Sequence, residues 1–102
     1  MRSIEEKAKQ IQAELHDAAE YAKCAIAAKM DDPDDARAYH TLSMQEMEHA
    51  QVLHGLIVKK IEAYRKEVGE PPADMQARYD WMHRLYIEAA SEVRVLQSMY
   101  LS

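Results

Sequence analysis

The sequence predicts an all-α protein whose 102 residues form a single domain, 1–102, of three long helices. Residues with high helix propensity dominate: alanine, leucine, methionine, glutamate, glutamine, lysine and arginine. Two glycines and three prolines leave few places for the chain to turn. Apolar residues also recur every three or four positions over long stretches, which is the period of an α-helix. Together these observations favour long helices joined by short turns.

The first helix is expected over residues 3–30. Ser3 is a good N-cap residue and Glu6 follows it at the spacing of a capping box. The apolar face of this helix comprises Ile4, Ala8, Ile11, Leu15, Ala18, Ala22, Ile26 and Met30. The acidic segment 31–35 then ends it, because Pro33 disfavours helix in the residue before it and suits the first turn of a new helix.

The second helix is expected over residues 33–68 and the third over 74–101, separated by the glycine and prolines of segment 69–72. The apolar seam of the third helix comprises Met75, Tyr79, Met82, Tyr86, Ala90, Val93, Gln97 and Tyr100. Helices this long and thin cannot bury all their apolar faces within one chain. We therefore expect a homodimer or higher homo-oligomer in which two helical hairpins form a four-helix bundle.

The charge pattern excludes several classes of partner. The net charge of −5 is spread over mixed signs with no basic stripe, so a nucleic acid is not expected to bind. No apolar run is long enough for a membrane span, and charged residues interrupt the first six positions before a signal peptide could form. Cys24 is the single cysteine and is expected to be a free thiol, which favours a cytoplasmic location.

A glutamate and a histidine interrupt an apolar stripe in the second helix. The stripe comprises Tyr39, Leu42, Glu46, His49, Leu53 and Leu56, at steps of three and four. On an inward seam, Glu46 and His49 face the core, where an unpaired polar group is costly and needs a partner. A metal ion is one such partner. The alternative is a hydrogen-bonded polar layer that fixes the register of a helical dimer.

Glu14 is the favoured third member of this group. In a regular hairpin, residues of the first two helices whose numbers sum to about 64 lie at one level, which places Glu14 opposite His49 or Ala50. It lies on the flank of the first helix; Asp17 and Glu20 remain alternatives. A two-fold axis would double Glu14, Glu46 and His49 into a set of carboxylates and imidazoles suited to two iron ions, with manganese or zinc as substitutes.

The segment Gln45–Ala50 resembles the Glu-x-x-His-Ala helix of the rubrerythrin and ferritin-like di-iron proteins. In that family a glutamate lies about thirty residues upstream with a tyrosine two turns after it, which matches Glu14 and Tyr21. The resemblance implies a di-iron centre held by Glu14, Glu46 and His49 that handles oxygen or peroxide. Tyr21 and Tyr39 are candidates to lie beside the metal and hydrogen-bond its ligands, with ordinary packing as the alternative.

The chain departs from that family in one respect: a second Glu-x-x-His is missing. The nearest substitute is the pair Asp80 and His83, and a tight turn would place His83 level with residue 59, two turns or more from His49. We therefore expect a surface pair, or a separate metal site between subunits. The half-length pattern resembles the encapsulated ferritins, in which two chains share a di-iron centre. An encapsulin shell is a partner for which residues 97–102 offer no visible docking tail.

The leading expectation is thus an iron-binding protein that oxidises ferrous iron or handles peroxide, as a ferroxidase or a rubrerythrin-like peroxidase. Storage, oxidase and peroxidase roles remain open. The alternative is a non-enzymatic helical assembly or adaptor protein with a polar, register-setting seam.

Overall fold

The computed structural model describes residues 2–102 and confirms the all-α expectation. It contains helices α1 (Arg2–Ala28), α2 (Pro33–Glu67) and α3 (Ala73–Leu101). The expected boundaries hold to within two residues. None of these helices carries an apolar stretch of the length and low charge that crossing a membrane requires.

The beginning of α1 differs from the expected capping box. The helix already includes Arg2, so Ser3 lies inside it and does not cap it. The Lys7 Nζ donates a hydrogen bond to the Ser3 Oγ over 2.9 Å, and Arg2 pairs with Glu6 over 3.1 Å. Both are contacts between neighbouring turns of one helix.

The turns at the two ends of α2 follow the local chemistry of their residues. The Asp32 side chain caps α2 by accepting a hydrogen bond from the Asp35 backbone N–H over 3.1 Å, and Pro33 occupies the first helical turn. After α2, Gly69 has a φ of +119°, a left-handed conformation that glycine adopts without a steric penalty. The chain can therefore reverse sharply before α3.

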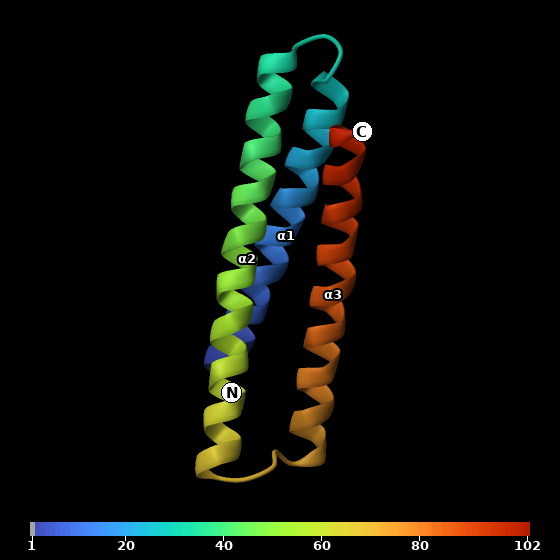
Figure 1. Cartoon of the computed structure of the whole chain (residues 1–102). Coiled ribbons are helices and arrows are strands. Elements are labelled where there is room, and N and C mark those ends of the chain that lie inside the picture. Colours follow the sequence, from blue (N-terminus) through green and yellow to red (C-terminus); the bar gives the residue numbers. More distant parts are fainter. Residues whose placement is uncertain (1) are drawn as a thin grey trace.

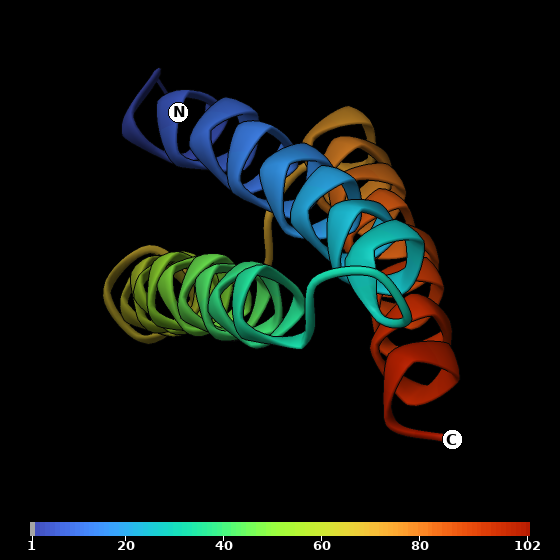
Figure 2. The ribbon, with the colours of Figure 1, turned by 90° about the horizontal axis from the view of Figure 1, so that it is seen from above.

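The three helices form an elongated molecule of 56 × 19 × 17 Å (Figure 1). Helices α1 and α2 form an antiparallel hairpin. Helix α3 runs parallel to α1 and packs mainly against it. Seen from above, α1 runs obliquely along one side of α2 and over α3, while α2 and α3 lie apart over much of their length (Figure 2). Helix α1 is thus the central element of the fold.

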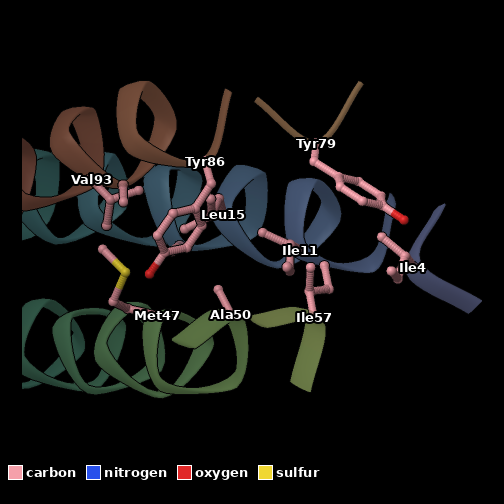
Figure 3. Close-up of a cluster of buried hydrophobic side chains, with 11 residues drawn as sticks. Ile4, Ile11, Leu15, Met47, Ala50, Ile57, Tyr79, Tyr86 and Val93 are labelled. Carbon is pink, nitrogen blue, oxygen red and sulfur yellow. The ribbon is translucent and has the colours of Figure 1, made fainter. Parts of the chain in front are cut away.

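The core lies where α1 meets both neighbours, and it contains residues from all three helices (Figure 3). Its members are Ile4, Ile11, Leu15, Ala18, Met47, Ala50, Ile57, Tyr79, Tyr86, Ala90 and Val93. Small residues on α1 let the helices approach closely, and Tyr86 of α3 extends into the space beside Leu15. The seams expected on α1 and α3 are largely confirmed, although Met30 is exposed.

One buried polar bridge joins all three helices. The Ser43 Oγ of α2 donates to the Ala18 carbonyl oxygen of α1 over 2.7 Å and accepts from the Gln97 Nε2 of α3 over 3.0 Å. Ser43 is fully buried and Gln97 nearly so. Because a buried hydroxyl that lost these partners would be destabilising, the bridge favours one register of the three helices.

The face of α2 that the chain buries differs from the expected one. Its buried residues are Ala36, Ser43, Met47, Ala50 and Ile57. The stripe that the spacing predicts to face the core is covered only in part. Leu42 and Leu56 are 37% and 40% exposed, and His49 is exposed. Tyr39, Glu46 and Leu53 are half-buried, and Leu53 packs against the core. The expectation is wrong for the exposed positions because α2 carries two apolar stripes, and periodicity does not tell which stripe its own neighbours cover.

Candidate metal centre

Glu14 of α1 and Glu46 and His49 of α2 converge at one level of the hairpin, as the register predicted. Each offers a ligand atom, and the three atoms lie within 4.8 Å of one another. The His49 Nδ1 lies 3.4 Å from the Glu14 Oε2 and 3.9 Å from the Glu46 Oε1. Glu46 and His49 share a side of α2 because residues three apart are neighbours on a helix. The turn that ends in the Asp32 cap then sets the level at which Glu14 meets them.

These three side chains lie at the surface of the hairpin and are only partly covered. The side chains of Glu14 and Glu46 are 29% and 20% exposed, and that of His49 is 59% exposed. The group is therefore accessible from one side and embedded on the other. A further molecule can approach it without any rearrangement of the core.

The group lies on the side of the hairpin that faces away from α3. On α1, Glu5 pairs with Arg78 of α3 over 2.6 Å, and Glu14 follows Glu5 by nine residues, or two and a half turns. Glu14 therefore lies on the opposite side of α1. On α2, Ser43 bonds to α3, whereas His49 lies about 120° around the helix from Ser43. The hairpin thus has an open face, which we define as the side that carries Glu14, Glu46 and His49.

The open face also exposes apolar side chains. Leu42 and Leu56 lie seven residues before and after His49, two turns away on the same side of α2. They are 37% and 40% exposed, and Val52 nearby is 65% exposed. A row of exposed apolar residues along one helix face is typical of a protein–protein contact.

The Glu14 carboxyl group perturbs the pKa of Glu46. Hydrogen bonding with the Glu14 side chain raises the pKa of Glu46 above its ordinary value of 4.5, and burial and the negative charge of Glu14 act in the same direction. The positive charge of His49 opposes this shift, and Asp17 adds a small contribution to it. Two adjacent carboxylates are thus held together in a place where a cation would relieve their repulsion.

Replacing Glu46 with Gln is expected to stabilise the metal-free protein at neutral pH by a few tenths of a kcal/mol, about the size of an interaction between two partly exposed charges. A carboxyl whose pKa is raised on folding stabilises the fold below its ordinary pKa, and this stabilisation is lost as the pH rises through the folded-state value. The stability difference between Glu46→Gln and the wild type should therefore grow above pH 4.5. Urea unfolding across this range measures it; a variant less stable than the wild type at pH 7 would contradict the proposed repulsion.

The donor set fits a divalent transition metal. Carboxylate and imidazole groups together bind iron, manganese and zinc. Three side chains provide too few donors for two ions, so a di-iron centre would need further ligands from outside this group.

Tyr21 and Tyr39, the candidates to lie beside the metal, lie closer to the interhelical turn. Their rings stack on each other with centroids 6.3 Å apart. Tyr21 follows Glu14 by seven residues, or about 10 Å along the helix. Within this chain the two tyrosines pack against each other, and a role beside the metal stays a prediction.

The alternative carboxylates lie outside the group. Asp17 is exposed, and Glu20 pairs with Lys23 over 3.4 Å. Neither belongs to the cluster that Glu14 completes. Of the three candidates on α1, the structure brings Glu14 to the residues of α2.

Asp80 and His83 do not form the surface pair that their spacing suggested. The Asp80 Oδ1 accepts a hydrogen bond from the Gln76 Nε2 over 2.9 Å, and the His83 Nδ1 lies 3.2 Å from the His54 Nε2. His83 therefore meets α2 at His54 and not at the expected residue 59, five residues further along. The level differs because α3 packs on α1 and does not run regularly along α2 (Figure 2). The contact between His54 and His83 joins separate helices, so spacing along one helix does not reveal it.

Comparisons with protein-family models, with curated proteins and with solved structures found no match to this chain.

Proposed function

We propose that this chain is a ferritin-like, iron-binding protein that works as a homodimer, with two metal ions shared between two copies of Glu14, Glu46 and His49. One observation carries the proposal: two carboxylates and an imidazole, contributed by two helices, offer ligand atoms within 4.8 Å of one another. The resemblance of the segment Gln45–Ala50 to a di-iron helix motif supports iron as the metal.

The open face explains why the site needs two chains. An isologous contact across a two-fold axis would bring a second Glu14, Glu46 and His49 opposite the first set. It would also bury Leu42 and Leu56, which the single chain leaves partly exposed. Two hairpins joined in this way make a four-helix bundle with its ligands pointing inward, an arrangement that di-iron carboxylate proteins use. Helix α3 lies on the far side of each hairpin and does not obstruct the contact.

The residues of the chain have distinct roles in this site. The Glu14 and Glu46 carboxylates balance the charge of the bound cations, and each offers two oxygens. His49 provides a neutral nitrogen donor, and Leu42 and Leu56 exclude water from the closed interface. Bound iron would supply the redox chemistry, by transferring electrons to oxygen or peroxide. Oxidation of ferrous iron is the leading activity, and manganese or zinc can occupy the same donors.

Glu46→Ala is expected to abolish stoichiometric metal binding, since it removes the ligand that shares a helix face with His49. The matched control is Glu48→Ala, which removes an exposed carboxylate two residues away on the same helix. Both variants and the wild type would be loaded with ferrous iron without oxygen, and their metal content measured by elemental mass spectrometry. Loss of iron in Glu46→Ala alone supports the proposal, and equal iron in both variants contradicts it.

A second candidate function is a non-enzymatic assembly or adaptor protein. One observation favours it: the His49 Nδ1 lies 3.4 Å from the Glu14 Oε2 and 3.9 Å from the Glu46 Oε1, so the three side chains can act as a polar layer without metal. In that case Glu46→Ala would change the oligomeric state of a protein that never bound metal. The same loading experiment separates the two functions.

A further inference from the structure

A groove of about 970 Å³ opens where α2 and α3 diverge. The first half of α1, the second half of α2 and the first half of α3 line it, mostly with apolar side chains such as Ile57, Ile61 and Met82. His54 and His83 stand at the end of this groove nearer the middle of the molecule. They form one of the few direct contacts between α2 and α3.

The two imidazoles are held in a defined geometry. The His54 Nε2 lies 3.2 Å from the His83 Nδ1. The His54 ring stacks nearly parallel on the buried Tyr86 ring, with centroids 4.1 Å apart and 7° between the planes. Tyr86 belongs to the core (Figure 3), so its ring fixes the plane of His54. His83 is exposed, so its ring can rotate until both nitrogens face one bound ion.

We propose that His54 and His83 form a second metal site, separate from the Glu14 group, which binds Zn²⁺ through the His54 Nε2 and the His83 Nδ1. Zinc–nitrogen bonds are about 2.0–2.1 Å long, so two nitrogens of a tetrahedral zinc lie about 3.3 Å apart. The observed 3.2 Å between the two nitrogens is close to this value. Solvent water completes the coordination, since His83 lies at the surface.

The lowered pKa of His54 suits a metal ligand. Burial lowers the pKa of His54 below its ordinary value of 6.5, and the neighbouring charge of His83 lowers it further. A neutral imidazole keeps a lone pair available to a metal. The geometry of the two nitrogens is the main support, and the electrostatics of His54 agree with it.

This site does not depend on the open face. His54 follows His49 by five residues, which places the two histidines about 140° apart around α2. His49 faces away from α3, whereas His54 contacts it. A zinc ion at this position would link α2 to α3 and close one end of the groove. Zinc binding would therefore stabilise the packing of α3 against the rest of the chain.

The test uses the Glu46→Ala variant as its background, so that the Glu14 group cannot account for bound metal. Zn²⁺ is titrated by calorimetry, and thermal unfolding is followed in parallel. One zinc ion is expected per chain, with a melting temperature raised by several degrees at zinc concentrations of about 100 times Kd. Co²⁺ should give visible absorption bands of a site with nitrogen ligands.

Adding His83→Ala to this background is expected to abolish the zinc heat, the cobalt bands and the thermal shift. His83 is exposed, so its removal should leave the fold intact. His54→Ala should also lose zinc, whereas the control His16→Ala removes an exposed histidine of α1 and should retain it. Zinc binding that survives His83→Ala, or no zinc binding in the background protein, would overturn the proposal. His54 and His83 would then be a hydrogen-bonded pair without a metal.

Discussion

Removing the metal with EDTA is expected to weaken the dimer by at least about tenfold in its dissociation constant, or about 1.4 kcal/mol. Each chain supplies half of the proposed ligand set, so a metal that binds only the assembled site stabilises the assembly by mass action. Without metal, the Glu14 and Glu46 carboxylates of both chains would face one another unneutralised. Sedimentation at micromolar concentration, with iron and after chelation, measures the change.

The matched variants give the control for this experiment. Glu48→Ala should respond to the chelator as the wild type does, since Glu48 is exposed and lies outside the group. Glu46→Ala should be insensitive to it, because the site is already lost. A wild-type dimer with the same dissociation constant before and after complete removal of iron would contradict the coupling of metal and assembly.

Leu15→Ala is expected to destabilise the fold by about 2–5 kcal/mol, the range measured when a buried leucine is truncated to alanine and leaves a cavity. Leu15 is 1% exposed and belongs to the same buried cluster as Tyr86 (Figure 3), so its truncation leaves a cavity inside the core. In a domain of this size such a loss lowers the melting temperature by about 10 °C or more. Circular dichroism during heating measures it.

Leu101→Ala is the control for this substitution. Leu101 is 69% exposed at the end of α3, and its removal should shift the melting temperature by no more than about 2 °C. Equal melting temperatures for Leu15→Ala and the wild type would mean that the helices do not pack around Leu15 as described. This outcome would question the fold itself rather than the metal site.

Much of the fold could be predicted from the sequence because it depends on local signals. Pro33 and the Asp32 cap define the first turn, and this turn sets the level at which Glu14 meets His49. Helical periodicity likewise identified the buried seam of α3. These features depend on residues close together in the chain, where helix geometry is nearly fixed.

The face of α2 could not be predicted because it depends on partners. The stripe of Leu42, Glu46, His49 and Leu56 has the spacing of a buried seam, yet α1 and α3 cover the neighbouring stripe of Ser43, Met47 and Ala50. Periodicity shows that a face is apolar and says nothing about which molecule covers it. On the proposed dimer, the second chain covers the stripe that the first chain leaves open.

The contact between His54 and His83 could not be predicted for a similar reason. Counting levels from the turn assumes two helices packed regularly side by side. Helix α3 instead packs mainly on α1, and its path relative to α2 is set by bulky side chains such as Tyr86 and by the Ser43–Gln97 bridge. The meeting point of α2 and α3 is therefore a property of the tertiary packing.

Native mass spectrometry of the iron-loaded protein shows whether two chains share one metal centre. A species of twice the 11.8 kDa chain mass is expected, carrying about two iron ions, with no iron on the monomer. Iron bound to the monomer, or a dimer that takes up no metal from ferrous iron, would contradict it.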